Sequence, residues 1–592
     1  MYVHFLKIIH VHFPTDKITC LNYLCSLTST KMKQIIECVP NISEGRDKDK
    51  INAIAQAAAA VPGVMLLDVD PGASTNRTVI TIAGEPSAVL EGAFQLMKKA
   101  QELIDMRSHK GEHPRQGATD VCPLVPIAGI TLEECAALAH QLGERVGREL
   151  GIPGYFYESA AKQEVRANLA NCRKGEYEGI DKISTAEWKP DFGPNEVTEG
   201  VRKSGITTIG ARDFLVAYNV NLNTTSTRRA NAIAFDIREA GRVLNEGGKP
   251  VLDENGEPKR IPGTLKSVKG IGWYIEEYGV AQLSLNLTNI NITPVHVAFE
   301  ESCNKAAERG VRVTGSELVG LIPKKSLLDA ADYFLKKQER SLGISDNEKI
   351  KIAVKSLGLD DLAPFNPEEK IIEFIIEKNL GGGKKLVDMS LTAFANETLS
   401  ESPAPGGGSV SAYCGAMGAA LAGMVANLSA HKRGWDARWE EFSNWAVIAK
   451  DIQDELNWLV DEDTQSFNKI MEAFGLPKNN DEEKAARTEA IQSASKYAME
   501  IPLRTARVAF KAFEVCEAMI EQGNPNSVTD AGVGALAIRT AVIGACYNVR
   551  VNAGGISDKV FTEKLMSEAS ELEKRTDERD VQLRTRVLGK IS

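Results

Sequence analysis

The sequence has 592 residues, of which 70 are basic and 80 acidic, so its formal net charge is −10. At about 150 residues per domain, this length predicts roughly four domains. A net negative chain without a long basic run lacks the charge pattern of proteins that bind nucleic acid or anionic membranes, so neither partner is expected. The ten cysteines form no Cys-x-x-Cys pair, which is typical of reduced thiols in a cytoplasmic protein.

Two apolar segments are candidates for targeting or membrane insertion. Residues 2–13 are interrupted by Lys7 and three histidines, and no basic region before them or small-residue cleavage site after them indicates a secretory signal. Residues 1–31 are therefore interpreted as an extension, either disordered or preceding a native start at Met32. Residues 410–426 are mostly Ala, Gly and Met, which favours close packing in a helical bundle over a membrane span.

Residues 32–212 alternate between strand-like and helical patterns. Strands are predicted at 35–42, 64–70, 77–83 and 118–127, and helices at 50–60 and 86–104. This order is the split βαββαβ arrangement, to which a helix at 132–150 and a strand at 155–158 are added. We expect a first subdomain here.

Residues 213–376 repeat the cycle. The predicted elements are a strand at 213–223, a helix at 227–239, a hairpin of 268–276 and 282–288, a helix at 297–309 and a strand at 313–322. Two units of similar order predict two subdomains facing each other across a cleft, where ligands commonly bind. Residues 245–263 are expected to be a surface excursion without a site.

Strand signals stop after about residue 340. Residues 377–387, with glycines at 381–383, are the predicted linker. Helical periodicity follows over 445–474, 481–499, 503–522, 527–551 and 558–576. The expected fold is therefore α/β, with two βαββαβ-like subdomains, followed by an all-α helical-bundle domain at 388–592. Two modules of different class suggest two activities.

The densest chemistry lies in residues 109–115, HKGEHPR. The pattern from His109 to His113 matches the H-x-x-E-H motif of zinc hydrolases, which requires a helix. Gly111 weakens a helix and Pro114 pushes His113 out of the helical region, so no metal is expected. A loop histidine between cations favours the neutral form that a general base needs. The alternative is a histidine that bonds a loop carbonyl.

Longer motifs around this loop resemble a known family. Residues 37–45, 66–77 and 109–123 resemble glutamate formiminotransferase, and residues 270–274 and 315–323 extend the resemblance. Residues 404–410 and 459–467 resemble formimidoyltetrahydrofolate cyclodeaminase. From about Met32 onward, the chain thus resembles the bifunctional formimidoyltransferase-cyclodeaminases.

The resemblance implies two reactions in histidine degradation. The first module would transfer formimino from N-formimino-L-glutamate to N5 of tetrahydrofolate, leaving L-glutamate. The second would close N10 onto the formimino carbon, expel ammonia and leave 5,10-methenyltetrahydrofolate. Tetrahydrofolate, in polyglutamylated form, is then a co-substrate, and a cytoplasmic homo-oligomer is expected. The alternatives are that only one module is active, or that the chain is a folate-binding scaffold without turnover.

The resemblance places the transferase base on His113 and its partners on Asp70 and Arg115. Attack by N5 requires the amine to lose a proton, which His113 can accept. Asp70 can pair with the cationic formimino group, and Arg115 offers a bidentate fork to a carboxylate of glutamate. The alternative for Asp70 is that it caps a turn.

The folate contacts of the family map onto both modules. In the first module they begin at Phe192, Gly193 and Pro194, run to Gly205, and resume at Phe235, Asp236 and Ile237. In the second, they fall on Gly406, Gly407, Gly408 and Ser409. These four residues precede a small-residue helix, whose free amides favour an anion or an electron-rich ring edge. The alternative is a flexible linker. Asn548 and Asn552 either bond the pterin or bridge two helices.

Two carboxylates, Asp461 and Asp463, are candidates for the cyclodeaminase acid. The helix that carries them has an apolar stripe made of Ile452, Leu456, Leu459, Phe467, Ile470 and Phe474. Asp463 fills the gap in this stripe, and Asp461, about 200° around the helix, lies toward the opposite face. A carboxylate on a buried face has a raised pKa, which suits proton delivery to departing ammonia. Asp463 is therefore expected to act, unless it only bonds a neighbouring helix.

Overall fold

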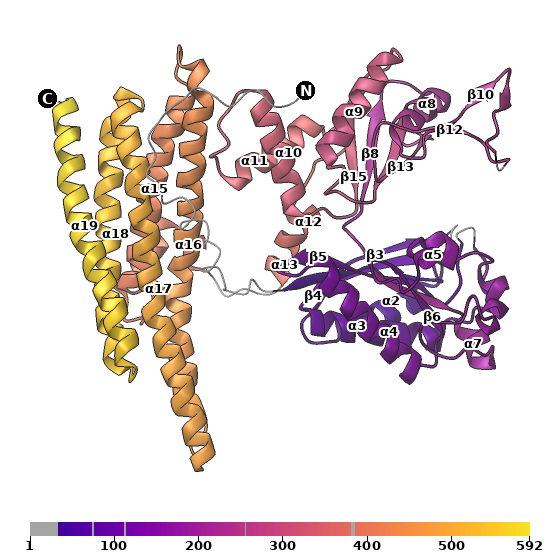
Figure 1. Ribbon diagram of the computed structural model, residues 1–592, viewed down its shortest axis with the longest axis horizontal. Coiled ribbons are helices and arrows are strands. Elements are labelled where there is room, and N and C mark those ends of the chain that lie inside the picture. Colours follow the sequence, from indigo (N-terminus) through magenta and orange to yellow (C-terminus); the bar gives the residue numbers. More distant parts are fainter. Residues whose placement is uncertain (1–33, 74–75, 112–113, 255, 380–384, 592) are drawn as a thin grey trace.

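The computed structural model describes residues 34–591 except 74–75, 112–113, 255 and 380–384. The 1–31 extension, His113 and the glycines at 381–383 of the predicted linker lie outside the described residues. Figure 1 shows the α/β part and the helical part side by side, which confirms the expected fold class.

The first subdomain is built on a mixed sheet. Its strands are β1 (Ile35–Cys38), β2 (Asn41–Ile42), β3 (Val64–Gly72), β4 (Arg77–Gly84), β5 (Thr119–Ala128), β6 (Gly154–Glu158) and β7 (Thr207–Ala211). Both β1 and β2 pair with β4 on one side and β5 on the other. They therefore form one strand interrupted at Pro40, which has no N–H to give to the sheet. The edge strand β3 pairs with β4.

One face of this sheet packs against α2 (Lys48–Ala59), α3 (Pro86–Leu103) and α4 (Leu132–Glu149). Alternate residues of a strand point to opposite faces, so Ile36, Ile80 and Ile82 lie in the core with these helices. Cross-strand pairing places Asp70 and Asn41 opposite Val79, two residues from Arg77. At this end, the face opposite α2–α4 therefore carries polar side chains, whereas Met65, Ala83 and Val125 of the same face pack in the core of the second subdomain.

Short helices close one end of the first subdomain. They are α5 (Glu164–Ala167), α6 (Leu169–Cys172), η1 (Tyr177–Ser184) and α7 (Glu199–Ser204). Tyr155, Tyr157 and Cys172 form a small separate core with this segment. It brings residues 173–178 next to the 109–115 loop.

The second subdomain repeats the order strand, helix, hairpin, helix, strand. It contains β8 (Val216–Leu222), α8 (Thr227–Ile237), β13 (Val268–Ile275), β14 (Val280–Leu287), α9 (Val295–Glu308) and β15 (Val313–Val319), with antiparallel order β13-β14-β8-β15. The expected surface excursion at 245–263 carries β10 (Asn245–Glu246), β11 (Lys249–Pro250) and β12 (Arg260–Ile261), and β12 pairs with β9 (Arg242–Val243), which precedes it. It projects from the sheet as a hairpin (Figure 1).

Helices α10 (Lys324–Lys337), α11 (Asp346–Leu357), α12 (Pro367–Lys370) and α13 (Ile372–Asn379) lead to the bundle. The turn between α10 and α11 touches the bundle directly. The Ser443 hydroxyl accepts a bond from Leu342 N (3.0 Å), and Asn427 donates to the Gly343 carbonyl (2.8 Å). Gly343 has no room for a Cβ because Ala446 lies against it. The two modules thus meet at this turn.

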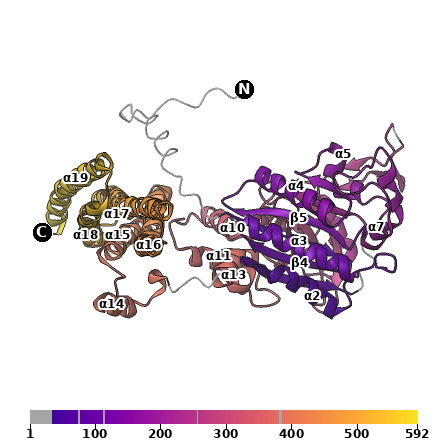
Figure 2. The ribbon, with the colours of Figure 1, turned by 90° about the horizontal axis from the view of Figure 1, so that it is seen from below.

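The helical module comprises η2 (Leu386–Asp388), α14 (Leu391–Leu399), α15 (Gly407–Ala430), η3 (Asp436–Arg438), α16 (Trp439–Gly475), α17 (Asp481–Gln522), η4 (Pro525–Ser527), α18 (Val528–Asn552), η5 (Ala553–Gly555) and α19 (Lys559–Ile591). Figure 2 shows its long helices end-on, with α14 set apart. Among the described helices, α15 and the η4–η5 segment are long and apolar enough to cross a membrane. Both pack inside the bundle, where Gly418 leaves no room for a Cβ beside α18.

The predicted break near residue 500 is wrong, because α17 continues through Pro502. Proline has no N–H, so the carbonyl of Ala498 loses its helical partner. The Asn552 side chain donates to that carbonyl from α18 (2.7 Å). Asn552 therefore bridges two helices, which was one of the two roles that the sequence analysis left open for it.

The predicted apolar stripe of α16 is only partly buried. Ile452, Leu456 and Leu459 lie in the core, whereas Phe467 is 41% and Phe474 51% exposed. The reason is tertiary, since the α16–α17 hairpin extends past the other helices of the bundle (Figure 1).

Candidate functional site

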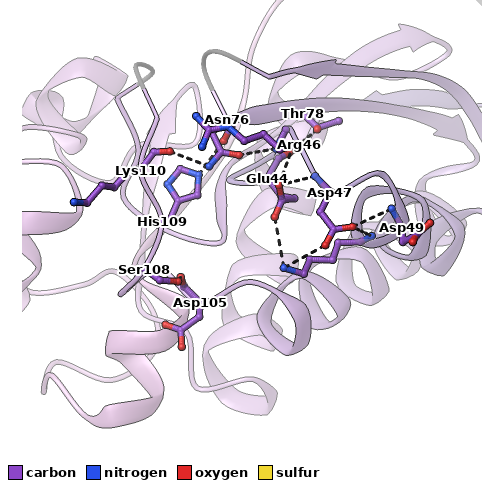
Figure 3. Close-up of polar contacts among 12 residues, drawn as sticks. Glu44, Arg46, Asp47, Asp49, Asn76, Thr78, Asp105, Ser108, His109 and Lys110 are labelled. Atoms are coloured by element: carbon purple, nitrogen blue, oxygen red, sulfur yellow. Dashed lines mark hydrogen bonds and ion pairs between the residues drawn. The ribbon is translucent and has the colours of Figure 1, made fainter.

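The loop at 109–117 is attached to the start of β4 through Asn76. The Asn76 side chain accepts a bond from Gly45 N (3.0 Å) and donates to the carbonyl of Lys110 (2.9 Å). Asn76 has a φ of 49°, a left-handed conformation that asparagine tolerates better than most residues. Figure 3 shows the bond between Asn76 and Lys110, with the His109 ring beside it.

His109 is fixed by bonds at both ring nitrogens. Its Nε2 lies 2.9 Å from the Asn76 carbonyl, which can only accept, so Nε2 carries the proton. Nδ1 then accepts from Arg115 Nε (3.4 Å). Burial lowers the pKa of His109, the Asn76 bond opposes this, and the Arg115 cation lowers it further. His109 therefore positions the loop as a neutral ring, and the base role of His113 stays a prediction.

Arg115 is buried, and carboxylates of this chain occupy its guanidinium. Glu178 accepts from both terminal nitrogens (2.9 and 2.8 Å), and Glu176 accepts from one (3.0 Å). The Glu178 bonds raise the pKa of Arg115 above its ordinary value. The Arg115 guanidinium, which the sequence analysis assigned to a carboxylate of the substrate, is therefore already bonded to Glu176 and Glu178.

Asp70 lies exposed on the edge strand β3. On the same face, Arg77 begins β4 opposite Gly72. Burial lowers the pKa of Arg77, as does the nearby Arg173 cation, while Asp120 and Asp70 act in the opposite direction. The sequence did not mark Arg77 as a site residue, although Arg77 is the last residue of the motif at 66–77 that resembles glutamate formiminotransferase.

Asp120 is the buried carboxylate next to these arginines. It accepts from Arg173 (2.5 Å) and from Gln116 N (3.0 Å). Burial raises its pKa, with Arg173 opposing. Asp120 and Gln116 lie in a quoted motif, whereas no local signal marks Arg173, which reaches the site from the end of α6.

The residues assigned to folate in the first module do not gather at one place. Phe192 lies in the core against Phe156, with ring centroids 5.0 Å apart. Gly193 packs on the Ile152 carbonyl with no room for a Cβ, and Pro194 follows it. Gly205 lies against the Gln116 carbonyl, beside the loop. Of this stretch, Gly205 is the residue that the structure brings to the site.

The second folate stretch lies on α8, which covers the other subdomain's sheet. Ile237 is fully buried in the core. Asp236 is ion-paired with Arg309 and Arg242, and the Arg238 guanidinium lies 3.9 Å from the Phe235 ring centre. No contact among the described residues joins these side chains to Asp70 or Arg115. Their role in folate binding stays a prediction.

The bundle holds Asp463 against the start of α15. Its carboxylate accepts from the Ser409 hydroxyl (3.1 Å) and from the Ser409 backbone N–H. Gly408 has no room for a Cβ because this carboxylate fills the space. Burial raises the pKa of Asp463, while the Ser409 bonds oppose the shift. The free amides predicted to bind a ligand are thus partly used by Asp463.

Asp461 faces a different neighbour. It accepts from Leu386 N (2.6 Å) and from the Val387 N–H, and so caps η2. Burial raises its pKa as well. Near Gly407 lies the Asn548 amide, which donates to Gly544 (2.9 Å). Asp463 and Asn548 therefore flank the first turn of α15, and Asp461 does not.

Among the described residues, no three His, Cys, Asp or Glu side chains are placed to share a metal ion. Glu112 and His113, part of the H-x-x-E-H pattern, lie outside this set. The eight cysteines in the described part of the chain are free.

Comparison with known proteins accounts for both modules. Residues 35–212 match the family model "Formiminotransferase domain, N-terminal subdomain", residues 217–377 match "Formiminotransferase domain", and residues 390–571 match "Formiminotransferase-cyclodeaminase". A formimidoyltransferase-cyclodeaminase of Rattus norvegicus is 42% identical over 542 residues, which are 91% of this chain and 96% of the relative. The chain belongs to the formiminotransferase-cyclodeaminase family.

The chain also matches two proteins that correspond to only part of its length. The first half is 42% identical to a glutamate formimidoyltransferase of Streptococcus pyogenes, covering 52% of this chain and 95% of the relative. The second half is 37% identical to a methenyltetrahydrofolate cyclohydrolase of Methylorubrum extorquens, covering 30% of this chain and 86% of the relative.

Proposed function

We propose that this family member is a bifunctional folate enzyme, a glutamate formimidoyltransferase joined to a formimidoyltetrahydrofolate cyclodeaminase. It transfers formimino from N-formimino-L-glutamate to tetrahydrofolate, then cyclises and deaminates the product to 5,10-methenyltetrahydrofolate and ammonia. The observation that carries this proposal is the presence of two separate polar centres. One surrounds Asp70 and the 109–117 loop, and the other surrounds Asp463 at the start of α15.

At the transferase centre, His113 takes the proton that N5 of tetrahydrofolate loses as it attacks the formimino carbon. Asp70, exposed on the free sheet face, pairs with the cationic formimino group. The neutral His109 holds Arg115 and Asn76 in place. This division of roles leaves His113 as the loop histidine that exchanges protons.

At the cyclodeaminase centre, Asp463 delivers a proton to the departing nitrogen. Its burial favours the protonated form, as a general acid requires. Asp461 is engaged in capping η2, which supports a lesser role. The first turn of α15, from Gly406 to Ser409, and Asn548 form the proposed folate side of this centre.

The family relationship also supports a cytoplasmic homo-oligomer that uses polyglutamylated tetrahydrofolate without a metal. Met417, Met424 and Leu428, spaced seven and four residues apart on α15, are exposed in the single chain. Such an apolar stripe on a core helix is typical of a subunit interface. We include these properties in the proposal.

Two variants, each expected to lose a different one of the two activities, test the proposal. His113→Ala is expected to abolish formimino transfer while ammonia release from supplied 5-formiminotetrahydrofolate persists. Asp463→Asn is expected to slow ammonia release by about a hundredfold, the low end of acid-base effects, while transfer persists. The matched control Asp461→Asn should slow it less.

Other outcomes would change the assignment. If Asp461→Asn had the larger effect, the acid would be Asp461. If the folded wild type bound tetrahydrofolate without turnover, the chain would be a scaffold. If only one product formed, a single module would be active.

A further inference from the structure

The free face of the first sheet holds a cation that these roles leave unused. Arg77 begins β4, opposite Gly72 and diagonal to Asp70. Its side chain is half-buried, and Nε is buried without a hydrogen-bond partner among the described residues. None of the described ion pairs includes Arg77. A buried guanidinium nitrogen without a partner is unusual in a folded protein.

Other buried polar atoms without partners gather around it. Within the described chain they are Arg173 Nε, Gln116 Oε1, Thr119 Oγ1 and Asn41 Oδ1. Asn41 and Thr119 belong to β2 and β5, which pair beside β4. Gln116 and Arg173 are linked through Asp120. Buried donors and acceptors without partners are sites where water or a polar ligand can bind.

The local charges define the ligand's chemistry. Arg77 and Arg173 are close enough to repel each other, and the neighbouring carboxylate Asp120 is already bonded to Arg173. Arg115, the other arginine of the site, is saturated by Glu176 and Glu178. An incoming carboxylate would therefore find its free partner at Arg77 rather than at Arg115.

We propose that Arg77, with Arg173 beside it, binds a carboxylate of the formimino donor. The inference rests on the proposed transferase function and names the residue that holds its amino-acid substrate. Diagonal residues on neighbouring strands lie about 7–8 Å apart. Asp70 and Arg77 thus suit a molecule with a formimino cation at one end and a carboxylate at the other.

The test compares Arg77→Gln with Arg148→Gln, which replaces an exposed arginine of α4 that pairs with Glu149. Arg77→Gln is expected to raise KM for N-formimino-L-glutamate at least about tenfold, with KM for tetrahydrofolate within twofold of wild type. Arg77→Lys should recover part of the loss. An unfolding transition of the transferase module at the wild-type temperature shows that the Arg77→Gln variant is folded.

Two further measurements locate the carboxylate and separate the two hypotheses. N-formimino-L-glutamine and N-formimino-4-aminobutanoate each lack one carboxylate, and one of them should lose affinity in wild type but not in Arg77→Gln. Calorimetry with L-glutamate should show binding that depends on Arg77. If that binding persists in a wild type without turnover, the proposed function fails, whereas the assignment of a carboxylate site to Arg77 stands.

The inference is overturned if Arg77→Gln leaves KM for the donor unchanged while Arg115→Gln raises it. It is also overturned if KM rises for tetrahydrofolate pentaglutamate alone, since the cation then holds the folate tail. If Arg77→Gln does not fold, the analogue series in Arg77→Lys decides, because equal penalties in this variant and wild type reject the assignment.

Discussion

At the scale of single residues, the position of Glu37 on a buried strand determines whether its carboxyl is protonated. Glu37 is 4% exposed and lies between Ala83 and Val125 of the neighbouring strands. Its carboxyl has no hydrogen-bond partner among the described residues. Burial raises its pKa to about 7, although the Arg212 cation opposes the shift. Near neutral pH, the folded chain therefore keeps a proton that the unfolded chain has lost.

This proton makes stability depend on pH in a defined direction. The ordinary pKa of this carboxyl is 4.5, and its pKa in the folded chain is about 7. Protonation of Glu37 therefore stabilises the folded state fully below pH 4.5, and this stabilisation is lost as the pH rises through 7. The loss is at most about 3 kcal/mol. Glu37→Gln should match wild type near pH 4.5 and unfold at higher temperature at pH 8. Calorimetry measures the unfolding temperature of the transferase module in each protein. Equal pH dependence of that temperature in wild type and Glu37→Gln would contradict the prediction.

At the scale of elements, α17 depends on a bond from another helix. Pro502 leaves the Ala498 carbonyl without a helical partner, and Asn552 supplies one. Asn552→Ala should destabilise the bundle by about 1–3 kcal/mol, the cost of an unsatisfied buried group. Adding Pro502→Ala should recover part of the loss, because alanine restores the N–H. The exposed Asn468→Ala is the control, and urea unfolding is the measurement. Equal loss with and without Pro502→Ala would assign Asn552 another role.

At the scale of the whole molecule, the two modules have separate cores. Among the described residues, the core residues of the bundle all fall between 386 and 583, and those of the α/β subdomains all fall between 36 and 376. The Gly343 turn adds few bonds between them. A chain cut at Gly382 is therefore expected to give two folded parts, the first with formimino transfer and the second self-associating.

A chain beginning at Met32 tests the same organisation from the other end, and should keep both activities, because no motif lies before it. Scanning calorimetry and both assays measure these outcomes. A more than tenfold loss of transfer in residues 32–376, or a single shared unfolding transition, would show that the modules depend on each other.

The sequence determined what rests on local spacing. Alternating residues in β4 and three- and four-residue steps in α16 to α19 defined strands and helices, because side-chain direction follows from backbone period. The 109–115 loop and Asp463 were found because their residues are adjacent in the chain. The same locality explains the error at Pro502, because the side chain that bonds the Ala498 carbonyl lies 54 residues from Ala498.

Only the tertiary structure decided which of these groups are free. Glu178 occupies Arg115 from 63 residues away, Arg173 reaches Asp120 across 53, and Ser409 meets Asp463 across 54. Whether a charge is available to a ligand depends on such partners and on burial, and neither is encoded by the spacing of nearby residues. For that reason the sequence pointed to Arg115, and the structure points to Arg77.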